Sequence, residues 1–322
     1  MRQFAKPTIV VSKCLEFDAC RYNGEMIPDV TIRNLQPFVT FIPVCPEVEI
    51  GLGTPRETIR IVEENGENRL VQPSTREDVT EKMEQFSNDF LQTIPDVDGF
   101  ILKNRSPSCG TRDVKIYSGF EKAPAKGKGS GLFGGAVVKK FSHLPIEEEG
   151  RLSNFIIREH FFTRLFTIAY YKMIKHNKNM KDLVSFQSDN KYLFMAYNQL
   201  KQKELGRIIA NHKNEKIEVV FENYEKTLYE LFMRTPRYTS NVNVCEHIFG
   251  YFKTKLKKQE KDHFIELLQK YAEKKIPLSS LLTILKSWAI RFDEKYLLRQ
   301  TYFEPYPEAL VEISDSGKGR DY

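Results

Sequence analysis

The stretch GFILKNRSPSCG, residues 99–110, joins a short apolar run to a turn that contains two serines, a proline and a cysteine. The apolar run from Gly99 to Leu102 predicts a buried strand. Serine and proline favour turns, so the chain is expected to leave the strand within a few residues. The sequence therefore predicts a strand that delivers a thiol, Cys109, into a tight and hydroxyl-rich turn.

Short apolar runs recur throughout the first half of the chain. They predict strands at residues 8–12, 39–44, 58–62 and 99–103. Residues 74–94 have apolar side chains at helical spacing and predict a helix capped by Ser74 or Thr75. Strands that alternate with helical segments are typical of an α/β fold with an open, largely parallel sheet.

The hydrophobic period changes from about Leu152, where aromatic-rich helical segments begin. Helices are predicted at residues 154–175, 187–213, 217–233, 242–275 and 276–292. The second half is therefore expected to be all-α. The predicted organisation is an α/β domain at residues 1–145, a helical domain at residues 150–312 and a disordered tail at residues 313–322.

With 322 residues, of which 41% are hydrophobic, the chain is long enough to bury a core in each of two domains. It contains no apolar run of membrane-spanning length and no apolar leader, which favours a soluble cytoplasmic protein without membrane contact. Its five cysteines are too few and too scattered for a disulfide scaffold. They are expected to be free thiols or metal ligands.

The net charge of +6 is unevenly distributed along the chain. Residues 1–150 contain 19 Lys and Arg against 22 Asp and Glu, a balance of −3. Residues 151–322 contain 30 against 21, a balance of +9. A basic second half favours a polyanionic partner, although a solvated, lysine-rich helical surface explains the same charge equally well.

Three cysteines, Cys14, Cys45 and Cys109, each follow a predicted strand. Because the carboxyl ends of parallel strands meet at one edge of a sheet, these thiols are expected to converge where ligands bind. A single free cysteine is more often a small buried hydrophobe, but three in equivalent positions favour a site. The chain has no C-x-x-C pair for a zinc ribbon, and thiolates suit an iron–sulfur cluster. With three protein ligands, a cubane cluster would leave one iron open.

Polar residues close to two of these cysteines indicate acid–base chemistry. Glu47 lies two residues after Cys45, where it can serve as a general base or acid. Ser106 and Ser108 precede Cys109 and offer hydroxyl groups that can donate a proton or orient a substrate. An ordinary turn would favour serine at these positions as well.

The segment GSGLFG, residues 129–134, has the glycine spacing of a dinucleotide-binding turn. It follows a loop rather than an apolar strand, so no nicotinamide cofactor is expected. The favoured interpretation is a glycine turn that caps a helix and leaves amides available to an anion.

Longer motifs surround these residues. They are VSKCLEFDACRYNG (11–24), PVCPEVEIGLGTPR (43–56), DGFILKNRSPSCG (98–110) and GLFGG (131–135). Together they resemble the iron–sulfur thiouracil desulfidase family, called TudS. The second half resembles the helical partner domain of a two-domain subgroup, called RudS. Its matching segments are LPIEEEGRL (144–152), HIFGYFK (247–253), IPLSSLL (276–282) and QTYFEPYPEAL (300–310).

The resemblance implies a [4Fe–4S] cluster held by Cys14, Cys45 and Cys109, with an open iron that takes the thiocarbonyl sulfur of the substrate. It also implies that Glu47 and Ser106 are catalytic. Glu47 would activate water, which is a poor nucleophile at neutral pH, and Ser106 would relay a proton. The implied reaction is a non-redox hydrolysis that converts 4-thiouridine in tRNA to uridine and releases sulfide.

Cys20 occupies a position often held by valine in the family, so the resemblance leaves it out of the cluster. The helical domain is expected to bind tRNA, while residues 1–145 form the catalytic domain. Two alternatives remain open at this point. One is a desulfidase that acts on free thiouracil or thiouridine, and the other is a non-enzymatic RNA-binding protein with an iron–sulfur cluster that acts as a sensor.

Overall fold

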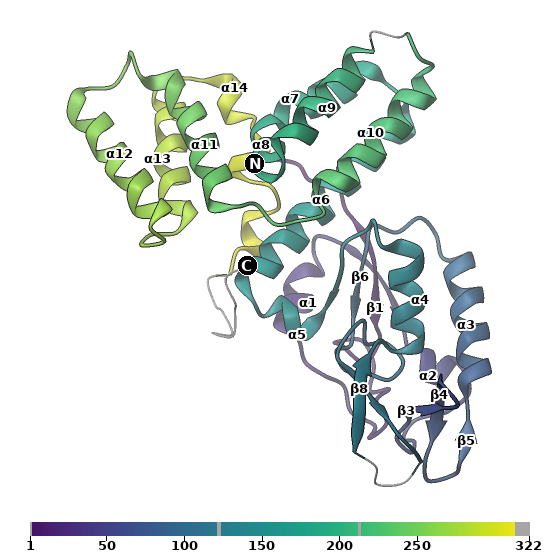
Figure 1. The fold of residues 1–322 in the computed structure, drawn as a ribbon. Helices are drawn as coiled ribbons and strands as arrows, with labels where there is room; N and C mark the ends of the chain where they lie inside the picture. Colours follow the sequence, from purple (N-terminus) through teal and green to yellow (C-terminus); the bar gives the residue numbers. More distant parts are fainter. Residues whose placement is uncertain (1, 121–123, 212–213, 313–322) are drawn as a thin grey trace. The chain divides into compact units, whose positions relative to one another are not determined.

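The computed structural model describes residues 2–120, 124–211 and 214–312, and the chain divides into two compact units (Figure 1). The α/β unit consists of Met1–Ala169 and Pro307–Tyr322, and the helical unit is Tyr170–Tyr306. The chain therefore leaves the α/β unit, forms the whole helical unit and then returns. The tail predicted to be disordered, residues 313–322, lies outside the described residues.

The α/β unit is built on a four-stranded parallel sheet, which confirms the fold class predicted for the first half of the chain. The strand order is β2-β1-β6-β9, with β1 at Thr8–Ser12, β2 at Thr40–Val44, β6 at Gly99–Leu102 and β9 at Ile146–Glu148. The central strands β1 and β6 are almost completely buried. Their continuous apolar runs are typical of parallel strands covered on both faces.

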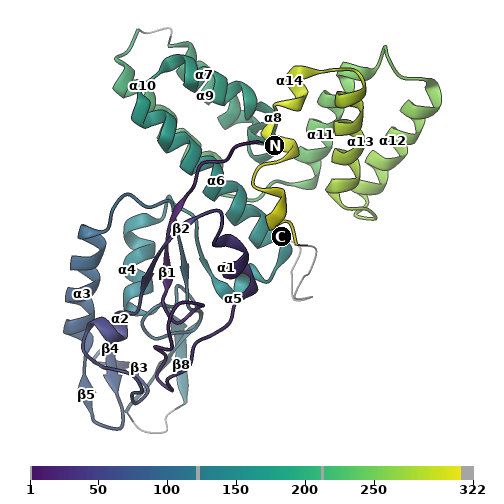
Figure 2. The ribbon, with the colours of Figure 1, turned by 180° about the vertical axis from the view of Figure 1, so that it is seen from behind.

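Helices cover this sheet from two sides. Helices α3 (Thr80–Thr93) and α4 (Leu132–Phe141) lie on one side, and α1 (Val30–Leu35) and α5 (Glu149–Leu152) lie on the other (Figures 1 and 2). The ring of Phe141 in α4 packs against Phe100 in β6, with 5.1 Å between the ring centroids. A short helix, α2 (Pro46–Glu49), begins directly after β2 at the carboxyl edge of the sheet.

The second sheet of this unit has the strand order β5-β4-β3-β7-β8. Its strands are β3 at Arg60–Glu64, β4 at Glu67–Gln72, β5 at Glu77–Asp78, β7 at Val114–Tyr117 and β8 at Ala125–Gly129. The strand predicted at residues 58–62 largely coincides with β3 of this sheet, and the other strands of this sheet were not predicted from the sequence. Strands β3 and β7 pair in parallel, and the other neighbouring pairs are antiparallel. The sequence of β8, AKGKG, has almost no apolar side chain and therefore gives no hydrophobic signal.

The helix predicted at residues 74–94 begins later than expected, at Thr80, so neither Ser74 nor Thr75 caps it. The preceding residues form a turn and β5, which pairs with β4. The hydroxyl oxygen of Thr80 accepts a hydrogen bond from the amide of Leu70 at 2.7 Å and ties the start of α3 to β4. Tertiary contacts therefore override the helical pattern of these residues.

The described part of the helical unit contains helices and loops and no strand, which confirms the all-α prediction. Its helices are the C-terminal part of α6 (Phe155–Asn177), α7 (Met180–Asp189), α8 (Lys191–Tyr197), α9 (Gln199–Ala210), α10 (Ile217–Leu231), α11 (Tyr238–Phe249), α12 (Lys258–Ala272), α13 (Leu278–Arg291) and α14 (Lys295–Leu298). The helix predicted at residues 187–213 is interrupted at Asn190 and Asn198. The Asn198 side chain accepts hydrogen bonds from two amides of α9 and caps that helix.

Aromatic side chains fill the core of the helical unit. The rings of Tyr171 and Tyr224 stack with 5.4 Å between their centroids, and both side chains are fully buried. Phe249, Phe264 and Trp288 form a second aromatic contact between α11, α12 and α13. In residues 2–120, 124–211 and 214–312, no helix is long and apolar enough to cross a membrane.

Candidate active site

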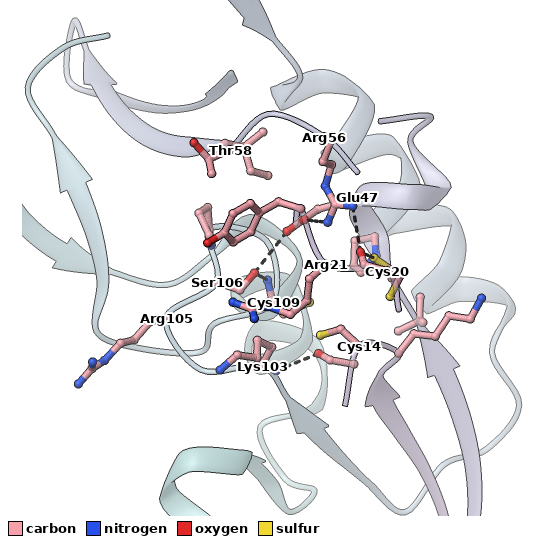
Figure 3. A pocket seen from close by; sticks show the side chains of 18 of the residues that line it. Cys14, Cys20, Arg21, Glu47, Arg56, Thr58, Lys103, Arg105, Ser106 and Cys109 are labelled. Carbon is pink, nitrogen blue, oxygen red and sulfur yellow. Dashed lines mark hydrogen bonds and ion pairs between the residues drawn. The ribbon is translucent and has the colours of Figure 1, made fainter. Parts of the chain in front are cut away.

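The carboxyl ends of β1, β2 and β6 bring the three predicted cysteine ligands to one cavity. Figure 3 shows Cys14 and Cys109 in this cavity together with Glu47 and Ser106. Cys14 follows β1 by two residues, Cys45 follows β2 directly, and Cys109 lies in the turn after β6. The cavity has a volume of about 220 Å³, and the three cysteines line it together with Glu47 and Ser106. All five residues predicted for the site therefore surround one space.

The thiols share a crowded and mostly buried environment. Burial, with smaller effects from Cys45 and Glu47, raises the pKa of the Cys14 thiol to about 12. Burial also raises the pKa of Cys109 well above its usual range, and Glu47 adds to this effect. Buried thiolates that lie beside one another and beside a carboxylate need positive charge among them. The donor set of this cavity therefore suits a cationic group that binds sulfur.

Within the described ranges, no three His, Cys, Asp or Glu side chains are placed to hold a single metal ion. A polynuclear cluster has a different requirement, because each thiolate binds a different iron atom and the sulfur atoms need not meet at one point. Three cysteines around a common cavity therefore fit an iron–sulfur cluster better than a mononuclear metal.

Cys20 also lines the cavity, as a fourth and buried cysteine. Its backbone carbonyl accepts a hydrogen bond from Nη1 of Arg56 at 2.9 Å and a longer one from Sγ of Cys45 at 3.8 Å. Burial is the main cause that raises the pKa of the Cys20 thiol to about 12. The backbone carbonyl of Cys20 thus helps to position the thiol of Cys45.

The carboxylate of Glu47 is held from both of its oxygens. Arg56 forms an ion pair with Oε2, and the side chain of Arg56 is only 3% exposed. Ser108 donates a hydrogen bond to Oε1 at 2.8 Å, and Ser108 is fully buried. The prediction from sequence missed both roles, although Arg56 ends the motif that contains Glu47. The sequence did offer a signal for Arg56, because this arginine follows the glycine-rich segment GLGTP (51–55) that comes after Glu47.

The hydroxyl group of Ser106 connects the turn to the carboxylate. Its oxygen accepts hydrogen bonds from the amides of Ser108 at 3.2 Å and Cys109 at 3.1 Å. Its proton can be donated to Oε1 of Glu47, at an oxygen–oxygen distance of 3.5 Å. Ser106 therefore positions Cys109 and also lies between the cavity and Glu47.

The glycine-rich start of α4 supports the same turn. The amides of Gly131, Leu132 and Gly134 donate hydrogen bonds to the carbonyls of Gly110 at 2.7 Å, Pro107 at 3.1 Å and Ser108 at 2.9 Å. The expectation that these amides are available to an anion is therefore wrong, because they bind the turn. The spacing in GSGLFG is explained by close packing of a helix end on the loop that carries Cys109.

Replacement of Gly134 by alanine is expected to destabilise the protein. A Cβ atom at this position would lie 2.3 Å from the carbonyl oxygen of Cys109, and backbone cannot move aside as a side chain can. Such overpacking typically costs about 1–3 kcal/mol, which urea denaturation followed by circular dichroism would detect. Gly127→Ala is the matched control, because a Cβ atom there meets nothing within 4 Å. Equal midpoints for the two variants would contradict this role of Gly134.

Two adjacent glutamates, at the end of β9 and the start of α5, bind both ends of the loop that carries Cys109. Glu149 pairs with Nζ of Lys103 and accepts a hydrogen bond from the amide of Asn104 at 2.7 Å. Glu148 accepts hydrogen bonds from the amides of Thr111 at 2.7 Å and Arg112 at 3.2 Å. Lys103 lines the cavity and favours the thiolate form of the nearby Cys14. The segment LPIEEEGRL thus contributes to the site, which its position at the end of the first domain did not indicate.

Comparisons with known proteins match two separate parts of the chain. Residues 9–149 match a family described as 2-thiouracil desulfurase, and residues 191–307 match a family described as a protein of unknown function, DUF1722. The uncharacterized protein YbbK of Bacillus subtilis (strain 168) is 36% identical over 118 residues, which are 34% of this chain and 77% of YbbK. The uncharacterized protein YbgA of Escherichia coli (strain K12) is 23% identical over 156 residues, which are 48% of this chain and 92% of YbgA.

A solved structure is also similar to this chain. It is the [4Fe-4S]-dependent thiouracil desulfidase TudS, with 26% sequence identity and a TM-score of 0.36. The match covers 46% of this chain and 93% of that chain. The family model matches residues 9–149, and the YbbK alignment spans more than two thirds of that relative. Through its residues 9–149, the chain belongs to the 2-thiouracil desulfurase family.

Proposed function

We propose that this protein is a [4Fe–4S]-dependent desulfidase that converts 4-thiouridine in tRNA to uridine and releases sulfide. The observation that carries the proposal is the convergence of three cysteines with Glu47 and Ser106 on one cavity of a 2-thiouracil desulfurase family member. Cys14, Cys45 and Cys109 would hold the cluster. When bound, such a cluster supplies a thiophilic iron that can take sulfur from a C=S group.

The protein's own residues then supply the proton transfers. The overall change is C=S plus water to C=O plus hydrogen sulfide, so water must lose a proton and sulfur must gain protons. Oε1 of Glu47 lies 3.5 Å from the hydroxyl oxygen of the cavity-lining Ser106, while Arg56 and Ser108 keep the carboxylate in one orientation. The Ser106 hydroxyl can pass a proton between Glu47 and the contents of the cavity.

The tRNA part of the proposal is supported by the basic second half of the chain. Residues 151–322 have a balance of +9, and the polyanionic backbone of RNA would neutralise these charges. A second candidate is desulfidation of a free thiolated base. The family description and the small cavity of about 220 Å³ favour it, because a base without its ribose and phosphates needs no additional surface.

The decisive test is anaerobic reconstitution of the cluster followed by measurement of sulfide release from thiolated tRNA and from free thiouracil. Release from tRNA supports the proposal, and release from the free base alone supports the second candidate. A reconstituted protein that releases sulfide from neither would contradict both and would favour a sensor.

The affinity of the full chain for thiolated tRNA is expected to fall steeply with salt. Each phosphate contact releases condensed counterions, so about six to ten contacts would reduce affinity roughly 10³–10⁵-fold between about 50 and 200 mM salt. Fluorescence anisotropy of labelled tRNA measures this slope. Binding of the uncharged nucleoside 4-thiouridine serves as the control, because it has no phosphate. A salt-independent affinity for tRNA would contradict an electrostatic role for the basic residues.

A further inference from the structure

Cys20 is a cysteine of the cavity that neither the proposed cluster nor the proposed proton transfers use. It lies in the loop between β1 and α1, where residues 16–26 form no helix or strand. Both Cys20 and Cys45 are buried, with 3% and 8% of their surfaces exposed, and Cys45 is the more exposed of the two. The cavity therefore contains one thiol more than the proposed cluster needs.

The side chains of Cys20 and Cys45 are neighbours. Sγ of Cys45 donates a hydrogen bond to the backbone carbonyl of Cys20 at 3.8 Å. Burial raises the pKa of the Cys20 thiol to about 12, and the charge of Cys45 and a hydrogen bond between the two side chains add to this effect. The thiol of Cys109, by contrast, has a side-chain hydrogen bond with Ser12. The contacts therefore place Cys20 and Cys45, which are 25 positions apart in sequence, within reach of each other.

Arg56 holds the backbone of Cys20 beside Cys45. Its Nη1 donates a hydrogen bond to the carbonyl of Cys20 at 2.9 Å (Figure 3) and another to the carbonyl of Gly53 at 2.9 Å. Its Nη2 pairs with Glu47, and the arginine side chain is only 3% exposed. A disulfide needs the α-carbons of its two cysteines to lie about 4.4–6.8 Å apart. Because Cys20 is held at this place and its loop has no strand ladder, the two sulfur atoms can join without a change in the sheet.

We infer that Cys20 and Cys45 are a redox-active pair, which forms a reversible disulfide when the chain lacks a cluster and meets a peroxide. Hydrogen peroxide converts one thiol to a sulfenic acid with release of water, and Cys45 is the expected site because it is the more exposed thiol. The second thiol then attacks this sulfur, so that an S–S bond forms and a second molecule of water leaves. Overall, the two thiols lose two protons and two electrons, and the peroxide is reduced to two molecules of water.

The disulfide and the cluster exclude each other at Cys45. Iron binds thiolate sulfur, and a sulfur atom in a disulfide is not available as a thiolate. The disulfide also preserves the site, because an unpaired sulfenic acid is oxidised further to a sulfinic acid that thiol reductants do not reverse. A thiol reductant opens a disulfide and returns both thiols. The inference goes beyond the proposed function, since it concerns the oxidised chain and does not depend on any substrate.

Peptide mapping of the full chain tests this pairing. Protein freed of iron by a chelator and of reductant under anaerobic conditions is treated with hydrogen peroxide, blocked with N-ethylmaleimide and digested with trypsin and the glutamate-specific protease Glu-C. Cleavage after Glu16 separates Cys14 from Cys20, which trypsin leaves in one peptide. The expected product joins the peptides of Cys20 and Cys45 and is lighter than the two reduced peptides by two hydrogen atoms. A crosslink from Cys45 to Cys14 or to Cys109, or no crosslink, would overturn the inference.

The oxidation state of Cys45 supplies a second readout. In Cys20→Ala and Cys20→Ser no neighbouring thiol captures the sulfenic acid, so the same peroxide treatment should increase several-fold the fraction of Cys45 that gains two oxygen atoms. Cys245→Ala is the matched control and should behave as wild type, because Cys245 is buried in the helical unit. Circular dichroism checks that each variant is folded. Equal fractions of sulfinic Cys45 in wild type and in both Cys20 variants would contradict the inference, whether or not the protein desulfurises any substrate.

Discussion

Anaerobically reconstituted variants in which Cys14, Cys45 or Cys109 is replaced by alanine are expected to lose the iron–sulfur cluster. These three thiols follow three adjacent parallel strands and line one cavity, so each would supply one protein ligand of the cluster. Visible absorbance, with chemical analysis of iron and sulfide per chain, measures the loss. Little cluster should remain in any of the three variants.

The two other cysteines provide matched controls for this experiment. Cys245 is buried in the helical unit near the hydroxyl group of Tyr302, at 3.9 Å, and Cys245→Ala should retain the cluster. Cys20 lines the cavity, and its backbone carbonyl, which an alanine preserves, accepts the hydrogen bonds from Arg56 and Cys45. Cys20→Ala should therefore also retain the cluster. Loss of the cluster from Cys20→Ala, with retention in one of the three ligand variants, would show that the ligand assignment is wrong.

The Glu47→Gln variant is expected to retain the reconstituted cluster and to lose about 10²–10⁴-fold in kcat for sulfide release. The amide keeps the size of the side chain but cannot accept a proton from water. Glu49→Gln is the control, because Glu49 is exposed and lies two residues further along the same short helix. Near-wild-type turnover by Glu47→Gln would remove this carboxylate from the mechanism.

The Ser106→Ala variant requires a different interpretation, because the structure gives this hydroxyl group two tasks. Its oxygen accepts a hydrogen bond from the amide of Cys109, so the substitution also disturbs the turn that carries this predicted cluster ligand. Cluster content must therefore be measured beside turnover for this variant. Slow turnover at full cluster content would indicate a proton-transfer role, whereas loss of cluster would indicate a positioning role.

The sequence predicted the parallel sheet and the convergence of the cysteines because both depend on local patterns. Apolar runs of four to five residues marked β1, β2 and β6, and the parallel topology places the ends of such strands together. The strand predicted at residues 58–62 largely coincides with β3, whereas β8 was missed because it carries lysine and glycine rather than apolar residues. A signal for the hairpin of β3 and β4 was present in the pair Asn65 and Gly66, which have positive φ angles and form the tight turn between these strands.

The contacts that shape the site could not be predicted because they join distant segments. Glu149 reaches Lys103 across 46 positions in sequence, and Ser108 reaches Glu47 across 61. No periodicity or spacing rule connects such pairs. Local sequence can indicate which residues carry the chemistry, but the side chains that orient them depend on how the loops pack.

The return of the chain to the α/β unit has a consequence for synthesis on the ribosome. Leu310, in the short 3₁₀ helix that ends the described chain, is buried, and Nη2 of Arg158 donates a hydrogen bond to the carbonyl of Glu312 at 2.7 Å. The first unit to emerge therefore cannot complete its own packing until residues 170–306 have been translated, a delay of roughly 7–30 s at typical rates of synthesis. During that interval the nascent α/β unit exposes the apolar surface that Leu310 later covers, and chaperones that bind unfolded chains would bind this surface.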